Sequence, residues 1–337
     1  MLPDNKYHSL PPFPNGWFAI ERSALLRPGQ ITTKRFVGCD VVIFRTASGE
    51  VCVMDAYCPH MGAHFGHGGR VVGEGVKCPF HGFEFDTSGK CIKTAYGSPP
   101  PLKALVRTYP AQEVNGLIMV YYHSHGEQPT WGIPQLNTDG WSKFRWMEYE
   151  LRSHPQEITE NSVDIGHFSE THGYTNVKAI SRPVFQENQL TIHYGMQRVN
   201  FINRIRKPVQ IEFVGQVYGL GYSIVEAHTL NYGITTRHSV LPTPLEDGKI
   251  MLRIGSSVQK IKKASDIHLL ASVLPNSLLN YVISEAVFRG YKHDVRQDFK
   301  IWENKKYILQ TPLADGDGPI VMYRKWAQQF YTPETSQ

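Results

Sequence analysis

The stretch that decides the fold begins at Cys58-Pro59-His60 and ends at Cys78-Pro79-Phe80-His81. It contains two short Cys/His pairs with seventeen residues between them. Each pair offers one thiolate and one imidazole, and both groups are metal ligands. A proline restricts each loop, while Gly62 and Gly82 give the backbone freedom just after the ligands. The spacing predicts two metal-binding loops that serve one site.

The order of the ligands indicates which metal is bound. Structural Cys2His2 zinc sites usually place their two cysteines together and their two histidines together, whereas this chain interleaves them. The alternative is that these are core cysteines and surface histidines that bind no metal, in which case the spacing of all four residues would be a coincidence. In a Rieske centre, two thiolates hold one iron and two imidazoles hold the other. The loops resemble the Rieske [2Fe–2S] motif, so Cys58, His60, Cys78 and His81 are expected to hold that cluster.

Residues next to the ligands indicate the kind of Rieske protein. Respiratory and photosynthetic members carry an extra cysteine after each ligand pair, and Ser and Tyr hydroxyls near the cluster. Here Ala63 and Phe80 stand at the cysteine positions, and Phe83 and Phe85 at the hydroxyl positions. Fewer hydrogen bonds to the cluster sulfurs stabilise the added electron less, which predicts a low reduction potential. The chain resembles the oxygenase and ferredoxin branch.

Length and composition favour two domains. A chain of 337 residues exceeds one ordinary core, so we expect a Rieske domain over residues 15–125 and a second domain over residues 126–337. Charged residues make up 19% of the chain, and the net charge of +5 is too small and dispersed to indicate nucleic-acid binding. The most basic run, residues 202–207, is interpreted as a solvated strand end or a docking patch for an acidic electron donor.

Cysteine usage and hydropathy indicate the compartment. The five cysteines form an odd set, and the polar residues 1–10 lack the apolar region of a signal peptide, so we expect a reducing cytoplasm. The sequence contains no run of eighteen apolar residues, so no membrane-spanning helix is expected.

A second group of candidate ligands lies within residues 160–173. Asp164 and His167 are three residues apart and would share a helix face. His172 is off that face unless the helix ends or distorts there, and Gly173 is a candidate for the C′ position just after the helix C-cap. Two histidines and a distant carboxylate form the facial triad of non-haem Fe(II) oxygenases, which leaves positions open for O2 and substrate. The alternative is an amphipathic helix with incidental histidines.

Periodicity predicts an α+β fold. Residues 15–125 read as short strands, residues 123–157 as a connector, residues 183–258 as an antiparallel sheet, and residues 265–306 as a helix broken near Pro275. Asp294 and Asp298 lie on the later part of that helix, and one of them should supply the third iron ligand. They are four residues apart, so spacing does not choose between them.

The order of these motifs resembles the catalytic subunit of Rieske non-haem iron oxygenases across nearly the whole chain. Residues 297–305 and 317–331 are similar to the branch of 3-ketosteroid 9α-hydroxylase and cholesterol 7-desaturase. The resemblance implies a helix-grip-like catalytic domain and favours Asp298 over Asp294 as the iron ligand. Animal sterol members of the branch carry a membrane anchor, which we do not expect here. The resemblance also implies a homotrimer, in which electrons pass between subunits from His81 through Asp164.

These motifs imply a terminal oxygenase with a [2Fe–2S] cluster, a mononuclear Fe(II) and O2 as co-substrate. We expect hydroxylation, desaturation or dealkylation of an apolar, steroid-like molecule. The glycines at 215, 219 and 221 lack the G-x-G-x-x-G spacing, so NAD(P)H should act only through a separate ferredoxin or flavin reductase. The alternatives are a Rieske electron carrier without oxygenase activity and an oxygenase scaffold that has lost its activity.

Overall fold

The computed structural model describes residues 9–198, 208–261 and 275–332. The basic run 202–207 lies outside the described residues. The chain divides into two units. The N-terminal unit comprises Phe13–Gln135 and Thr243–Asp247, and the C-terminal unit comprises Met1–Pro12, Leu136–Pro242 and Gly248–Gln337.

Three small antiparallel sheets make up the described part of the N-terminal unit, with one 3-10 turn, η1 (Ser23–Leu25). Their strand orders are β1-β11-β10, β2-β3-β4-β9 and β5-β6-β7-β8. The strands are β1 (Gly16–Arg22), β2 (Ile31–Phe36), β3 (Cys39–Arg45), β4 (Val51–Asp55), β5 (Arg70–Val72), β6 (Gly75–Lys77), β7 (Glu84–Asp86), β8 (Cys91–Lys93), β9 (Thr108–Tyr109), β10 (Ala111–Val114) and β11 (Leu117–Tyr122). The all-β character expected for this part of the chain is confirmed.

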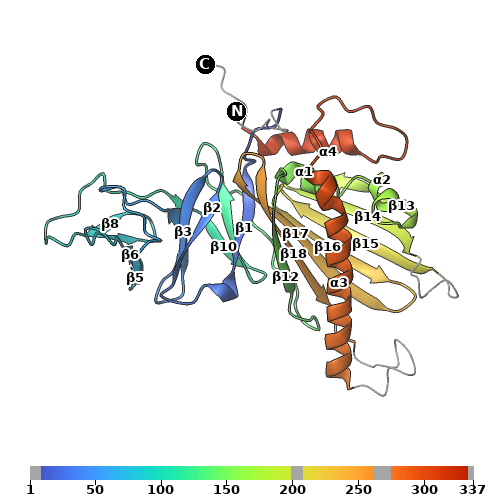
Figure 1. The fold of residues 1–337 in the computed structure, drawn as a ribbon, viewed down its shortest axis with the longest axis horizontal. Coiled ribbons are helices and arrows are strands. Elements are labelled where there is room, and N and C mark those ends of the chain that lie inside the picture. The colour runs from blue at the N-terminus through green and yellow to red at the C-terminus, as the bar shows by residue number, and fades with distance from the viewer. Residues whose placement is uncertain (1–8, 199–207, 262–274, 333–337) are drawn as a thin grey trace. The chain divides into compact units, whose positions relative to one another are not determined.

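The C-terminal unit is built on one seven-stranded antiparallel sheet with the order β12-β18-β17-β16-β15-β14-β13 (Figure 1). Four α-helices and one 3-10 turn accompany it in the described residues. The strands are β12 (Arg145–Leu151), β13 (Thr175–Phe185), β14 (Gln189–Arg198), β15 (Val209–Tyr218), β16 (Tyr222–Thr229), β17 (Ile234–Glu246) and β18 (Lys249–Val258). The helices are α1 (Pro155–Glu160), α2 (Gly166–Glu170), α3 (Asn276–Trp302), α4 (Ile320–Ala327) and η5 (Gln328–Phe330). The expected α+β class is therefore confirmed.

Residues 123–157 are not the simple connector that composition predicted, because β12 and the start of α1 lie within them. Strand β12 alternates the apolar or aromatic side chains of Met147, Tyr149 and Leu151 with Glu148 and Glu150, which is a strand signal that the composition of the whole segment obscured. It pairs with β18, from Arg145 opposite Ser256 to Leu151 opposite Ile250. The three apolar side chains pack in the cluster between the sheet and α3.

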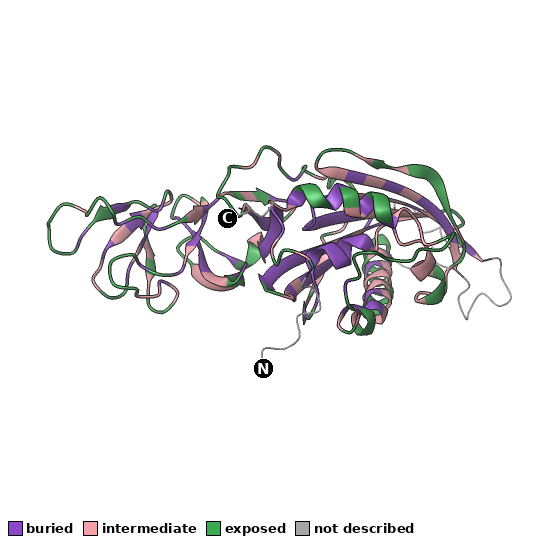
Figure 2. Cartoon of the chain, turned by 90° about the horizontal axis from the view of Figure 1, so that it is seen from above, coloured by how far each residue is buried: buried purple, intermediate pink, exposed green. Residues whose placement is uncertain are grey.

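Helix α3 crosses one face of this sheet (Figure 1). Its later half packs Val295 and Trp302 against buried side chains of β18, among them Ile250, Leu252 and Ile254. Burying these side chains contributes about 1.5–3 kcal/mol each. Figure 2 shows long purple, buried stretches along strands of the sheet, whereas α3, seen nearly end-on, is mostly intermediate or exposed. Among the described residues, no helix is both long and apolar enough to cross a bilayer.

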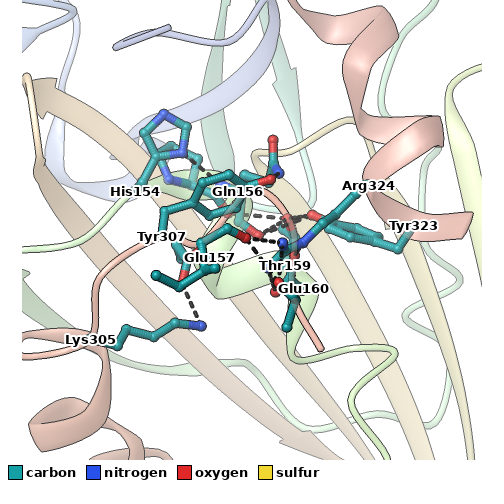
Figure 3. A network of polar contacts seen from close by, with 12 residues as sticks. His154, Gln156, Glu157, Thr159, Glu160, Lys305, Tyr307, Tyr323 and Arg324 are labelled. Atoms are coloured by element: carbon teal, nitrogen blue, oxygen red, sulfur yellow. Dashed lines mark hydrogen bonds and ion pairs between the residues drawn. The ribbon is translucent and has the colours of Figure 1, made fainter. Parts of the chain in front are cut away.

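Helix α1 is short but entirely buried, and several of its polar side chains contact the C-terminal region (Figure 3). The guanidinium of Arg324 donates to both carboxylate oxygens of Glu160, at 2.7 and 2.9 Å. Lys305 Nζ lies 2.5 Å from a carboxylate oxygen of the fully buried Glu157. Tyr323 donates its hydroxyl proton to the carbonyl oxygen of Gln156. These contacts join α1 to α4 and to the segment after α3.

We predict that Arg324→Met destabilises the protein by about 3–5 kcal/mol, because it leaves the Glu160 carboxylate buried without its cation. The two side chains are only 16% and 7% exposed. The double variant Arg324→Met/Glu160→Leu removes both charges and should recover much of the loss. Urea unfolding of both variants and of the wild type measures the difference. Equal stability of the single and double variants would contradict this account.

Candidate functional site

The two Cys/His loops of the N-terminal unit have the same local closure. The backbone N–H of Cys58 donates to the carbonyl oxygen of Ala63, and that of Cys78 donates to the carbonyl oxygen of Phe83, each at 2.8 Å. Both bonds therefore span five residues. The repeat explains why the two loops can present equivalent sets of ligands although the histidines are spaced differently.

The glycines and histidines of the loops lie as the sequence requires. Gly62 and Gly82 have φ of +73° and +67°, values that side chains rarely allow. The rings of His60 and His81 lie beside each other, with centroids 4.7 Å apart. His60 also stacks on Phe83 at 4.3 Å, which fixes its plane. The two imidazoles therefore face one small region.

The two cysteines of these loops are 2% and 3% exposed. Burial raises the pKa of the Cys58 thiol. A thiol must lose its proton to bind a metal. Burial disfavours the negative thiolate, so the positive charge of a bound metal would be needed to stabilise it. Two adjacent buried thiols and two adjacent imidazoles are the donor set that a Rieske cluster needs. Cys58, His60, Cys78 and His81 thus fit the cluster that the sequence predicts.

A second candidate centre lies in the C-terminal unit. His167, His172 and Asp298 each offer one ligand atom, and these atoms lie within 4.8 Å of one another. The side chains of His172 and Asp298 are 7% and 8% exposed, and that of His167 is 13% exposed. Two imidazoles and one carboxylate at this separation match the facial triad of non-haem Fe(II) enzymes.

Hydrogen bonds orient both rings toward one point. Nδ1 of His167 lies 2.5 Å from the carbonyl oxygen of Asp164, and Nδ1 of His172 lies 2.9 Å from Oε1 of Gln297. In each pair the ring nitrogen is the donor, because the partner is an amide oxygen. The Nε2 atoms are thus left available to bind a metal, and that of His172 is 3.5 Å from Asp298 Oδ2.

The end of α2 brings the two histidines together. Helix α2 ends at Glu170, and the N–H of Gly173 donates to the carbonyl oxygen of Ser169. The C-cap of α2 is Thr171, and two residues later Gly173 has φ of +68°, a left-handed conformation that turns the chain away from the helix. The chain therefore turns just after His172, whose ring centroid lies 5.1 Å from that of His167. The five-residue spacing suits a short helix that stops, as the sequence suggested.

Asp164 lies before α2 rather than within it. Its Oδ1 accepts the backbone N–H of His167 at 3.2 Å and is 3.8 Å from His167 Nδ1. Its carbonyl oxygen, rather than its carboxylate, is the close partner of the His167 ring. Burial raises the pKa of Asp164, but the hydrogen bonds and charge of His167 outweigh it, so the pKa is lowered and the group is ionised.

The two late aspartates have different partners. Asp294 accepts two hydrogen bonds from the guanidinium of Arg198, at 2.7 and 2.8 Å, and a longer one from the Tyr174 hydroxyl. Asp298 lies next to His172 instead. Burial lowers the pKa of His172, but the hydrogen bond and charge of Asp298 outweigh it and raise that pKa. A proton therefore competes with a metal at this imidazole.

A cavity of about 570 Å³ lies against the triad, between α3 and the sheet. Apolar side chains dominate its wall, with a minority of polar ones. The apolar ones include Ile158, Phe168, Ile192, Met196, Val209, Ile211, Phe213, Val225, Val240, Val287, Val295 and Trp302. Because the three ligands also line it, a molecule inside the cavity would lie next to the metal site.

Sequence reasoning assigned no role to Gln297, Arg198 or His238. Gln297 directly precedes Asp298, so its position beside a ligand was a usable signal. Arg198 and His238 reach the cavity only through strand register, which one sequence does not reveal.

We predict that His167→Ala, His172→Ala and Asp298→Ala each lower the iron content from three to two per chain and leave the Rieske absorption intact. Asp294→Ala should keep all three irons, because its carboxylate serves Arg198. Metal analysis with visible spectroscopy measures both quantities. Retention of iron by Asp298→Ala together with its loss in Asp294→Ala would overturn this assignment.

Comparisons with known proteins agree with both centres. A Rieske [2Fe–2S] domain family matches residues 16–110, and the 3-ketosteroid 9alpha-hydroxylase C-terminal domain family matches residues 120–331. The chain is 30% identical to cholesterol 7-desaturase nvd of Xenopus laevis, over 97% of this chain and 74% of that protein. It is 29% identical to the oxygenase component of a 3-ketosteroid-9-alpha-monooxygenase of Rhodococcus rhodochrous, over 95% and 83%.

Solved structures show the same fold. Pseudomonas putida NdmA with caffeine superimposes with a TM-score of 0.69 at 17% identity, covering 93% of this chain and 89% of that one. Dicamba monooxygenase bound to dicamba gives 0.66 at 16% identity, covering 94% and 96%. Because an oxygenase C-terminal domain family matches the chain as well as the Rieske domain family, the electron-carrier alternative does not hold. The chain belongs to the Rieske non-haem iron oxygenases, and within them to the family that has the 3-ketosteroid 9α-hydroxylase C-terminal domain.

Proposed function

We propose that this oxygenase oxidises a C–H bond of a neutral, steroid-like molecule. The single observation that carries the proposal is the largely apolar cavity of about 570 Å³ that opens onto His167, His172 and Asp298. Small-molecule sites commonly measure about 300–1,000 Å³ and are mostly apolar. The relatives named above act on cholesterol and 3-ketosteroids, which gives the substrate class independent support.

The residues divide the work between two centres. Cys58, Cys78, His60 and His81 would hold the [2Fe–2S] cluster, and the triad would hold Fe(II). When bound, these groups supply electron transfer and activation of O2. The protein contributes orientation and exclusion of water: Gln297 fixes the His172 ring, and side chains such as Phe168 and Trp302 keep the wall of the cavity apolar.

Electrons come from a separate donor, as in other multi-component systems. We propose a ferredoxin or a flavin reductase that itself uses NAD(P)H. We also propose a homotrimer, in which the carboxylate of Asp164 accepts a hydrogen bond from His81 of the partner subunit and connects it to His167. The ionised state and partial exposure of Asp164 support this role, because such a carboxylate can still accept an additional donor.

We place the protein in the cytoplasm. The five thiols are unpaired in the structure, including the buried Cys52 and Cys91, which suits a reducing compartment.

Substrate-dependent O2 consumption tests the proposed function. The purified oxygenase, coupled to a surrogate reductase, is offered a panel of steroids, aromatic carboxylates and N-methyl compounds. We expect O2 uptake and an oxidised product with one or more steroids only, because the cavity wall is apolar. Uptake stimulated by the aromatic acids or the N-methyl compounds, and by no steroid, would refute the proposed substrate class.

Asp164→Asn tests the proposed connection between subunits. Asparagine keeps a side-chain oxygen for the backbone N–H of His167, so the local cap survives. The negative charge is lost, so we expect cluster and iron to remain while turnover falls by orders of magnitude. Single-turnover kinetics on the pre-reduced variant measure how fast the cluster is oxidised.

Glu170→Gln is the matched control, since it removes one charge from an exposed position on α2. It should leave the rate of cluster oxidation unchanged. A wild-type rate in Asp164→Asn would show that Asp164 serves only as a cap of the helix.

A further inference from the structure

Two polar atoms in the wall of the cavity have no hydrogen-bond partner among the residues that the structure describes. They are Oγ of Ser223 and Nδ1 of His238, and both atoms are buried. Ser223 is only 4% exposed. Buried polar atoms in native proteins are nearly always bonded, and leaving one unbonded costs folding free energy. Two such atoms in an apolar cavity therefore indicate a ligand that supplies the missing bonds.

Strand register places these two side chains side by side. In the pairing of β16 with β17, Ser223 lies opposite Val240 and Val225 lies opposite His238. Residues directly opposite each other share a face, so all four face the cavity. Ser223 and His238 are then diagonal neighbours, with Cβ atoms about 7–8 Å apart. One bound group can reach both.

The imidazole of His238 is held in place and neutral. Its Nε2 lies 2.9 Å from Oγ1 of Thr236, and its ring packs on Tyr291 with centroids 4.2 Å apart. The Tyr291 hydroxyl is itself fixed, donating to the carbonyl oxygen of Ser239 at 3.0 Å. Burial lowers the pKa of His238 to about 4, against the opposing charge of Asp294. A neutral imidazole offers Nδ1 either as an acceptor or as an N–H donor.

The charges in the cavity favour a neutral ligand. Among the described residues that line it, Arg198 is the one permanent cation, and both carboxylate oxygens of Asp294 already bind its guanidinium. A carboxylate substrate would have to displace Asp294. A hydroxyl or carbonyl group needs only a neutral donor or acceptor.

The polar pair and the metal ligands line the same cavity at different places. Tyr291, on which His238 packs, precedes Asp298 by seven residues on α3, which is about two helical turns. A molecule that fills the cavity can therefore bring one group to the polar pair while another part lies against the triad.

We propose that His238 and Ser223 form a polar anchor that binds a hydroxyl or carbonyl oxygen of the substrate, separate from the carbon that is presented to the iron site. This anchor rests on the proposed steroid-like substrate and adds to it the oxygen function by which the substrate is oriented. It makes His238 and Ser223 specificity-determining residues.

Binding of three matched steroids tests the anchor. The probes are 5α-androstane, 5α-androstan-3β-ol and 5α-androstan-3-one, which differ only in the oxygen function. Binding to the full-length, cluster-loaded protein is followed by tryptophan fluorescence, because Trp302 lines the cavity. We expect the wild type to bind the alcohol, the ketone or both about 10–100-fold more tightly than the hydrocarbon, as one or two satisfied hydrogen bonds would give.

Both His238→Phe and Ser223→Ala should reduce the ratio of the affinity for the oxygenated steroids to the affinity for the hydrocarbon. For His238→Phe we expect the two affinities to differ by no more than about threefold. Affinity for the hydrocarbon should stay unchanged in both variants. Ser239→Ala is the matched control. Within the described part of the chain its Oγ is also buried without a hydrogen-bond partner, but Ser239 belongs to the opposite face of β17. It should keep the wild-type ratio. If His238→Phe does not fold, as judged by thermal unfolding, Ser223→Ala decides the matter, since it deletes one oxygen atom.

The outcomes are distinct. Equal wild-type affinity for all three steroids, or wild-type ratios in both variants, overturns the anchor and leaves the steroid proposal standing. Failure of the wild type to bind any of the three overturns both.

Discussion

The hydrogen bond between Nδ1 of His172 and Oε1 of Gln297, 2.9 Å long, joins segments 125 residues apart, and the candidate iron site depends on it. It fixes the tautomer and plane of one ligand, and it comes from the residue next to Asp298, which is another ligand. One contact therefore sets both the orientation of an imidazole and the approach of α3 to the loop that carries the histidines. Without it, either ring nitrogen of His172 could face the metal.

The segment that carries His167 and His172 also needs tertiary contacts, because short helices such as α2 are not stable alone. A loop near the C-terminus provides these contacts. The N–H of Ile165 donates to the carbonyl oxygen of Asp317. Gly318 has φ of +92°, and a Cβ there would lie 2.1 Å from the carbonyl oxygen of Val163. Only glycine allows this approach. The ion pair of Arg324 and Glu160 then holds α4 on α1, just before the same segment.

These contacts show how far one sequence can be interpreted. The ligand loops at 58–81 were predictable because each is closed by bonds within five residues. His167 was predictable for a similar reason, since its neighbours in sequence are its neighbours in space. Spacing alone did not choose Asp298, because a residue four away shares its helix face, and only resemblance favoured it. The position of His238 in the cavity wall could not be predicted from the sequence. Strand register depends on the whole sheet, and a shift of one residue would move every side chain of the strand to the opposite face.

The two aspartates of α3 show how one helix serves two requirements. Asp294 and Asp298 are four residues apart and point the same way, about one helical turn from each other. Both would be costly as unpaired buried charges. Asp298 faces two imidazoles that a divalent metal can share with it, whereas Asp294 is neutralised by Arg198, the last residue of β14. The Arg198–Asp294 pair connects the sheet to α3 along the wall of the cavity, where apolar side chains alone would tend to close the space. The pair thus neutralises the second carboxylate within the protein, so that of the two aspartates only Asp298 is left facing the imidazoles.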